Sequence, residues 1–345
     1  MPLRFFLPVP DTRSWKPGEH AKEYGGVSGA PETLWLADDT AFTWRANSVI
    51  STPFFSGIQL MTLIDSVLEH LDLEQIETNL FRGISEAMGP PRVFGGQVIG
   101  QALIAALRTV EDRPCHSLHG YFLRPGDPSI PIIYEVDRIR DGRSFTTRRV
   151  IAIQKGEAIF SMSASFQVFE EGLSHQIEMP DVPHPDDLPS EEEMFEKRKK
   201  DMTPEMIAMM KRDRPIEMKR VEDFDYFNPV KCDPVQHIWF RSKKKLGDDT
   251  AQHQCLLAYA SDMGLLSTAT LPHGMSFMTG LMTASLDHAM WFHRDFRFDD
   301  WVLIAMDSPS SAGSRGFNRG NMFTEEGLLI ASVAQEGLMR LITRG

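Results

Sequence analysis

The strongest hydrophobic pattern in the chain lies in residues 95–110, which read GGQVIGQALIAALRTV. Apolar residues recur there at the spacing of an α-helix, and prolines stand before and after the stretch but not inside it. Gln97 and Gln101 are the only polar side chains before the last turn. A surface helix carries a wide polar face, so a helix this apolar must be covered by other structure. The pattern therefore predicts a buried helix.

Short runs of β-branched and aromatic residues follow in residues 116–169, and the turn signals PGDP, RDG and KGE separate them. Such runs are typical of an antiparallel meander. A buried helix followed by a long meander predicts a curved sheet wrapped round the helix.

The second half of the chain repeats this order, with a strand expected over residues 237–245, a helix over 250–266 and a meander over 281–339. Matches at one ungapped offset support a tandem duplication. The offset is 171 positions (313 − 142, for example), and it pairs Gly142 with Gly313, Arg148 with Arg319, Gly156 with Gly327, and Ser161 with Ser332.

These patterns divide the chain into a proline-rich N-terminal arm (1–57), a first α+β domain (58–170), an interdomain linker (171–233) and a second α+β domain (234–345). The first domain is expected to begin with a helix over residues 58–73 and an edge strand over 73–85. The linker is rich in proline and charge and is expected to hold one short helix over 190–200.

Composition excludes several classes of protein. The net charge of −12 argues against a non-specific nucleic-acid binder, which needs a basic surface. The three cysteines show no CxxC spacing, which fits a reducing compartment and excludes a disulfide scaffold. No apolar run approaches the roughly 20 residues of a membrane span, and no signal peptide is recognised. We therefore expect an intracellular protein without a membrane span.

The polar residues inside the second copy are the candidates for chemistry. Asp262 stands among apolar residues of the second predicted helix, where it faces either solvent at the helix end or a cavity. In a cavity, a carboxylate held by donors could act as a general base. Gln335 shares a strand face with Ala331 and Val333, at the position where the first copy has Ala164. A glutamine there is either a bonded core residue or part of a site.

Ser285 shares one face of a predicted strand with Asp287, Ala289 and Trp291, where a serine is either structural or part of a site. With a carboxylate and an amide it would complete the groups that hold and deprotonate one water molecule. The chain has no GxSxG motif, so a covalent acyl-serine is not favoured.

Further residues are candidates for substrate binding. Gly95 and Gly96 begin the buried helix, where backbone amides could point at a carbonyl oxygen or a phosphate, or could simply form a tight turn. Arg315 and Arg319, or else Arg92 or Arg124, could reach an anion, or could form surface ion pairs. No histidine pair has a supporting carboxylate cluster, so no metal site is expected.

Several motifs together resemble the acyl-CoA thioesterase II family, which includes bacterial thioesterase II and the peroxisomal acyl-CoA thioesterases. They read RVFGGQVIGQAL, HSLHGYFLRPGD, DGRSFTTRRVIAIQ, YASDMG, LDHAMWFHR and VAQEGLMR. The resemblance covers about residues 58–340. It implies a double hotdog fold, in which two tandem α+β units each wrap a curved antiparallel sheet round a long helix. It also implies further assembly into a homo-oligomer.

The resemblance implies that the substrate is acyl-CoA, which is hydrolysed to free acid and CoA without a cofactor. Family members use an Asp, a Thr or Ser, and a Gln to orient the attacking water. These roles fall on Asp262 in YASDMG, on Ser285 in ASLDH, where bacterial members carry Thr, and on Gln335 in VAQEG. The chain lacks the C-terminal Ser-Lys-Leu address of peroxisomal proteins, so the compartment is left open between peroxisome and cytoplasm.

Three alternatives stay open. A hotdog enoyl-CoA hydratase or dehydratase would need a histidine in the acyl tunnel, for which His119 and His288 are the candidates. A thioesterase could instead act on a specialised acyl product of a secondary pathway. A chain with a decayed site could bind acyl-CoA without hydrolysing it.

Overall fold

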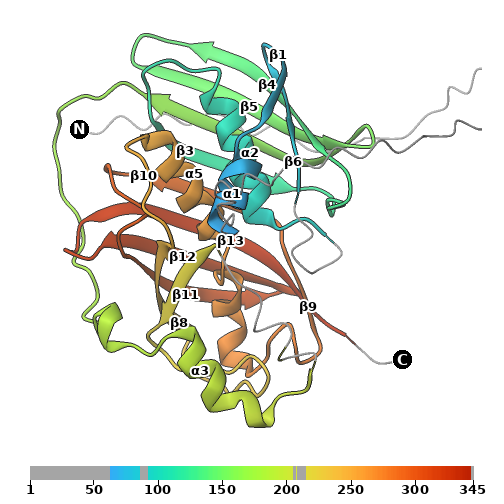
Figure 1. The fold of residues 1–345 in the computed structure, drawn as a ribbon, viewed down its shortest axis with the longest axis vertical. Coiled ribbons are helices and arrows are strands. Elements are labelled where there is room, and N and C mark those ends of the chain that lie inside the picture. Colours follow the sequence, from blue (N-terminus) through green and yellow to red (C-terminus); the bar gives the residue numbers. More distant parts are fainter. Residues whose placement is uncertain (1–62, 86–91, 205–206, 208–214, 343–345) are drawn as a thin grey trace, which may run out of the picture. The chain divides into compact units, whose positions relative to one another are not determined.

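Two apolar helices and one long antiparallel sheet dominate the computed structural model of the protein (Figure 1). The structure describes residues 63–85, 92–204, 207 and 215–342. The predicted arm at residues 1–57 and the first residues of the helix expected over 58–73 lie outside the described residues.

The helices of the described chain follow the apolar pattern and the capping residues of the sequence. Ten of the 13 residues of the second helix are buried, as its apolar pattern predicts. The α-helices are α1 (Leu63–Leu71), α2 (Gly95–Leu107), α3 (Glu191–Arg198) and α5 (Thr250–Ser261), and the 3-10 helices are η1 (Pro185–Asp187), η2 (Lys199–Asp201) and η3 (Leu266–His273).

The strands of both meanders alternate buried and more exposed side chains, as strands of a sheet with one covered face do. Their bounds are β1 (Glu74–Glu77), β2 (Leu80–Gly83), β3 (Cys115–Phe122), β4 (Ile132–Asp141), β5 (Phe145–Gln154), β6 (Glu157–Gln167), β7 (Ile216–Arg220), β8 (Val235–Ser242), β9 (Leu281–Ser285), β10 (Asp287–Phe292), β11 (Val302–Ala312), β12 (Arg315–Thr324) and β13 (Leu329–Leu341).

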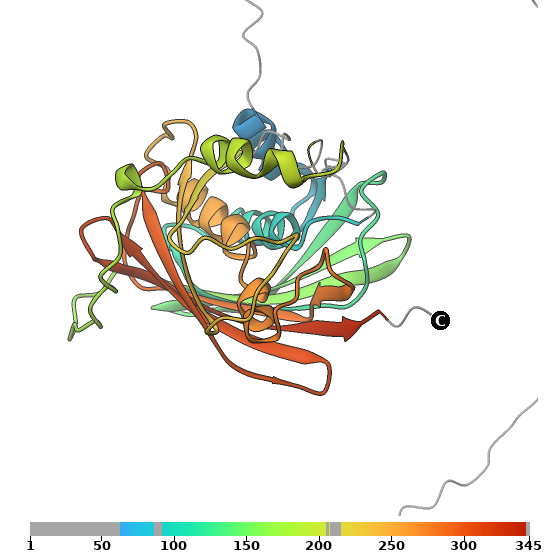
Figure 2. The same cartoon turned by 90° about the horizontal axis from the view of Figure 1, so that it is seen from below.

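The strands pair in the order β1-β2-β4-β5-β6-β3-β10-β13-β12-β11-β8-β7, and β9 pairs with β13 beside this path. The order is symmetric about its centre, where β3 and β10 pair antiparallel with His119 opposite Ala289. Figure 2 shows the strands curving round α2 and α5. Each half is thus a curved sheet wrapped round one helix, which is the double hotdog arrangement that the sequence predicts.

The polar side chains of α2 are paired inside the core. Nε2 of Gln97 donates to the carbonyl oxygen of Ile84 (3.1 Å). Oε1 of Gln101 accepts a hydrogen bond from the hydroxyl of Tyr134 (2.6 Å). Buried amides are tolerated in an apolar helix when they find partners in this way.

Helices α2 and α5 approach each other through glycines. A Cβ atom built on Gly96 would lie 2.2 Å from the carbonyl oxygen of Tyr259, and one on Gly100 would lie 3.3 Å from that of Cys255. Residues four apart lie on the same face of a helix, so both glycines face α5. The two backbones are therefore so close that glycine is required at position 96.

The repeat is confirmed at its turn glycines but not at its arginines. Gly142 and Gly313 both follow the first strand of equivalent hairpins. Arg148 is only 1% exposed, whereas the side chain of Arg319 is 60% exposed. Two residues join β11 to β12, one fewer than join β4 to β5, so the next strand follows with an offset of 170 (318 − 148). The residue equivalent to Arg148 is therefore Asn318.

Three segments differ from the prediction. The edge strand expected over residues 73–85 is a hairpin of two strands, β1 and β2. Strand β7 lies inside the stretch 171–233 that was expected to be a linker, and it pairs with β8, so residues 216–220 belong to the sheet. The helix expected to reach residue 266 ends at Ser261, and Gly264 with φ of +86° follows this end. The positions of the two domain boundaries stay a prediction.

We expect Gly96→Ala to destabilise the fold by about 2 to 3 kcal/mol or more, because the new methyl group would collide with a backbone carbonyl that cannot rotate away. Thermal and urea unfolding measure this loss. Gly172→Ala is the control, since a Cβ at Gly172 would meet no atom within 4 Å, and it should change stability by less than about 0.5 kcal/mol. Equal stability of the two variants would contradict the close approach of the helices.

Candidate active site

Asp262 caps the C-terminal end of α5, where three other segments of the chain meet it. Its Oδ1 accepts hydrogen bonds from Oγ of Ser285 at the end of β9 (3.1 Å) and from Nε2 of Gln335 in β13 (2.8 Å). Its Oδ2 accepts a hydrogen bond from the backbone N–H of Gly96 in the first turn of α2 (3.0 Å). The structure therefore brings the three predicted catalytic residues together. We call these four residues the Asp262 cluster.

The first turn of α2 is shaped around this carboxylate. A Cβ atom on Gly95 would lie 2.7 Å from Oδ2 of Asp262, so a side chain at this position would displace the carboxylate. The N-terminal end of a helix carries partial positive charge and favours an anion. The amide of Gly96, which the sequence analysis left free for substrate, thus has Asp262 as its partner.

Opposing effects act on the pKa of the Asp262 carboxyl group. Desolvation raises its pKa, and this effect exceeds the opposing hydrogen bonds from Gln335, Ser285 and Gly96 and the opposing charge of Arg92. The net result is a pKa above the usual range of an aspartate. Asp262 and Ser285 are half-buried, whereas Gln335 is fully buried. Asp262 and Ser285 thus keep part of their surface exposed, and the raised pKa makes the carboxylate a stronger base than an ordinary aspartate.

Ser285 reaches the cluster because the strand breaks after it. The sequence predicts that Ser285 shares a face with Asp287, Ala289 and Trp291, and this prediction is wrong. Leu286 separates β9 from β10, so the alternation is interrupted there. Ser285 consequently turns to Asp262, while the buried residue His288 begins the inward face of β10.

Gln335 shares the buried face of β13 with Ala331 and Val333, as predicted. Its cross-strand partner on β12 is Asn318, which is also fully buried. Asn318 was not singled out in the sequence. It lies on the inward face of β12 together with the buried Gly316 and Gly320, which stand two residues before and after it.

The arginines proposed for substrate binding have other hydrogen-bond partners, although the positive charge of Arg92 acts on Asp262. Arg315 pairs with Glu336 (2.9 Å) and Arg319 with Asp307 (2.7 Å), both in exposed ion pairs. Arg92 is exposed and donates to the carbonyl oxygen of Thr283 (2.8 Å). These contacts are those of surface residues, so a role in phosphate binding stays a prediction.

Comparison with known proteins identifies the family to which this chain belongs. Residues 210–338 match the family model described as acyl-CoA thioesterase, and residues 84–167 match the acyl-CoA thioesterase N-terminal domain. Acyl-CoA thioesterase 2 of Haemophilus influenzae is 40% identical over 280 residues, which cover 81% of this chain and 98% of that protein. The chain belongs to the acyl-CoA thioesterase family. It is therefore a thioester hydrolase.

Other relatives agree with this assignment. Acyl-coenzyme A thioesterase 8 of Homo sapiens is 40% identical, over 79% of this chain and 88% of that protein. The crystal structure of acyl-CoA thioesterase II TesB2 from Mycobacterium marinum has 45% identity and a TM-score of 0.66, over 80% of this chain and 98% of that one. A hot dog protein from Alicyclobacillus acidocaldarius, 20% identical with a TM-score of 0.65, supports the fold alone.

The hydratase alternative needs one histidine in the acyl tunnel, and its candidates His119 and His288 lie in different surroundings. His119 is exposed, and its ring packs edge-on against Trp291 at 5.2 Å between centroids. His288 is buried and lies 2.8 Å, through Nε2, from Oγ of Ser261. The family assignment disfavours that alternative.

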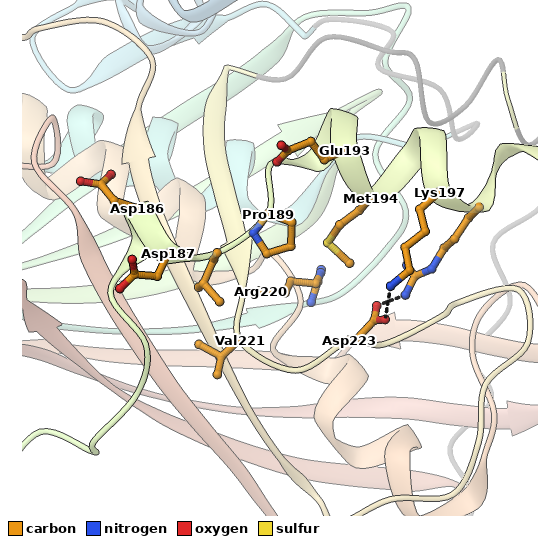
Figure 3. Close-up of a pocket in the computed structure, with 11 residues that line it drawn as sticks. Asp186, Asp187, Pro189, Glu193, Met194, Lys197, Arg220, Val221 and Asp223 are labelled. Carbon is orange, nitrogen blue, oxygen red and sulfur yellow. Dashed lines mark hydrogen bonds and ion pairs between the residues drawn. The ribbon is translucent and has the colours of Figure 1, made fainter.

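A cavity of about 700 Å³ lies beside α3 and the end of β7 (Figure 3). Figure 3 shows Lys197 directed at Asp223, and Asp186, Asp187 and Glu193 also line the cavity. Because charged groups of both signs line it, it is a poor environment for an acyl chain. Members of the Asp262 cluster are not among its lining residues.

Two features are not found within the described part of the chain. No helix in it combines the length and apolarity that crossing a membrane requires. No group of three or more His, Cys, Asp or Glu side chains lies within it in an arrangement that could hold a metal ion.

We expect Gln335→Met to raise the pKa of Asp262 further, because the variant removes a donor that stabilises the carboxylate. A raised folded-state pKa means that the stability contributed by this group is lost as pH rises through that pKa. Carbon-13 NMR of labelled aspartate carboxyl groups, assigned with Asp262→Asn, measures the titration. Gln176→Met, at an exposed glutamine that bonds to the backbone of Gly327, is the control. A lower pKa in Gln335→Met would contradict the assigned role of the amide.

Proposed function

We propose that the protein hydrolyses fatty acyl-CoA to free fatty acid and CoA with a water molecule that Asp262 activates and that Ser285 and Gln335 orient. The observation that carries this proposal is the convergence of a hydroxyl, an amide and a backbone N–H on one half-buried carboxylate. These are the groups that a general-base mechanism needs, and the same residues match the family motifs. The names of the relatives support acyl-CoA as the substrate.

The proposed reaction begins with a water molecule beside Asp262. The carboxylate accepts a proton from this water while the water oxygen attacks the thioester carbon. A tetrahedral oxyanion forms, and it collapses with cleavage of the carbon–sulfur bond. CoA thiolate leaves, and the proton held by Asp262 can pass to it or to solvent. A thiolate is a good leaving group, so no strong general acid is required.

The raised pKa of Asp262 suits this role. A carboxylate whose pKa is raised takes a proton from water more readily, while the hydrogen bonds from Gln335, Ser285 and Gly96 favour its ionised form. The donors also fix its orientation, which lowers the entropic cost of reaching the reactive geometry. Remaining backbone N–H groups in the first turn of α2 are the proposed donors to the oxyanion.

Binding of the CoA moiety is assigned only in outline. Protein atoms fill the space beside Gly95 and Gly96, so these glycines would contact the substrate through their backbone alone. Arg315 and Arg319 would have to leave their carboxylate partners to bind phosphate. Assembly into a homo-oligomer, and a peroxisomal or cytoplasmic location, likewise stay predictions.

We expect the purified protein to release free thiol from acyl-CoA, and Asp262→Asn to lower kcat by roughly 10²–10⁴-fold with little change in KM, because the loss removes the base and not the binding surface. A thiol-reactive dye measures the release over a panel of short, long, branched and dicarboxylic acyl-CoAs. The panel also tests the alternative of a specialised acyl substrate.

Circular dichroism of the variant controls for folding, and an assay of enoyl absorbance runs in parallel. A hydratase would change that absorbance without releasing thiol, and a binding protein would do neither. Unchanged turnover in a folded Asp262→Asn protein would refute the proposed mechanism.

A further inference from the structure

His288, which is not one of the three predicted catalytic residues, lies on the strand next to Gln335. His288 is in β10, and the register that pairs Ala289 with Ala334 brings His288 opposite Gln335 on the neighbouring strand. Both side chains are 1% exposed and face the core. Nε2 of His288 lies 2.8 Å from Oγ of Ser261, the residue that precedes Asp262.

His288 and Gln335 carry complementary atoms that lack partners. Within the described chain, the buried side-chain nitrogen and oxygen atoms without a hydrogen-bond partner are Nδ1 of His288, Oε1 of Gln335 and Oδ1 of Asn318. Nε2 of Gln335 donates to Asp262, so Oε1 of the same amide is turned away from the carboxylate. A ring N–H directed at this oxygen would satisfy both His288 and Gln335, and buried polar groups are rarely left unpaired.

The tautomer of His288 decides whether this hydrogen bond forms. Burial lowers the pKa of His288 to about 4, and interaction with the Gln335 amide opposes that shift. The ring is therefore neutral at neutral pH and carries one N–H. Oγ of Ser261 lies 2.8 Å from Nε2 and also 2.8 Å from the carbonyl oxygen of Ala258, and its single proton can be donated to one of them.

If the Ser261 hydroxyl donates to Nε2, the ring proton resides on Nδ1 and can be donated to Oε1 of Gln335. If it donates to Ala258, Nε2 can bond to Oγ of Ser261 only by carrying the ring proton and donating it. Nδ1 and Oε1 would then both be acceptors without a donor. The first arrangement satisfies more buried atoms than the second.

We propose that His288 is a positioning residue, which donates from Nδ1–H to Oε1 of Gln335 and so holds the amide with its N–H toward Asp262. An amide can otherwise rotate its oxygen toward the carboxylate, where two acceptors would repel each other. The order of donors is Ser261 to His288, His288 to Gln335, and Gln335 to Asp262. This inference rests on the proposed function of the Asp262 cluster.

Two substitutions at position 288 separate the two ring nitrogens. The side-chain amide of asparagine can place an N–H near the position of Nδ1, whereas that of glutamine reaches the position of Nε2. We expect His288→Gln to lower kcat by roughly 10- to 100-fold with KM within about 2-fold, since Gln335 loses its orientation. His288→Asn should keep kcat within about 5-fold of the unmodified protein, although it leaves a larger void.

Nitrogen-15 NMR of histidine-labelled full-length protein tests the tautomer without any assay of activity. The His288 signals, assigned by their loss in His288→Asn, should show a protonated Nδ1 and an unprotonated Nε2. A protonated Nε2, or a kcat of His288→Gln equal to or above that of His288→Asn, would overturn the proposal. If unmodified protein and Asp262→Asn hydrolyse acyl-CoA equally, the proposed function fails instead, and the NMR result still decides the role of His288.

Discussion

The contact between α2 and α5 at Gly96 is the constraint on which the site depends. Because no side chain stands between the helices, the first turn of α2 reaches the C-terminal cap of α5, and the Gly96 amide meets the carboxylate of Asp262. This hydrogen bond links the two halves of the repeat, because Gly96 belongs to the first half and Oδ2 of Asp262 to the second. Ser285 and Gln335 then approach the other oxygen from the sheet. The close approach of α2 to α5 therefore fixes the packing of the two helices, and it also brings the positive end of α2 to the Asp262 carboxylate.

The two halves of the repeat differ at the pair of facing residues that includes Gln335 in the second half. In the first half, the cross-strand pair is Arg148 and Ala164, and in the second half the equivalent pair is Asn318 and Gln335. Arg148 is buried but fully engaged, with Thr109 and Asp141 among its partners. In the second half, Oδ1 of Asn318 has no hydrogen-bond partner, and Oε1 of Gln335 is the acceptor proposed for His288. The first half thus holds a fully bonded arginine at this position, whereas the second half holds two amides, one of which donates to Asp262.

The sequence predicted those parts of the structure that depend on local pattern. The apolar period predicted α2, and the alternation in the last meander predicted the inward face that carries Gln335. It did not predict β7, because the alternation of Ile216 and Met218 with charged residues is short and lies in a charge-rich stretch. The break at Leu286, the shorter β11–β12 hairpin and the Gly96 contact depend on register and on long-range packing. The strand pattern made Ser285 a candidate but placed it on the wrong face, and the motif resemblance also assigned it to the site.

The central claim is that Asp262 activates water and is not itself the nucleophile. A single turnover of acyl-CoA in water enriched in oxygen-18 tests this most directly, with mass spectrometry of both the fatty acid and the peptide that contains Asp262. We expect one heavy oxygen in the fatty acid and none in the peptide, because the water oxygen attacks the thioester carbon directly. Heavy oxygen in the Asp262 peptide after one turnover would show a covalent acyl-aspartate and would contradict the account.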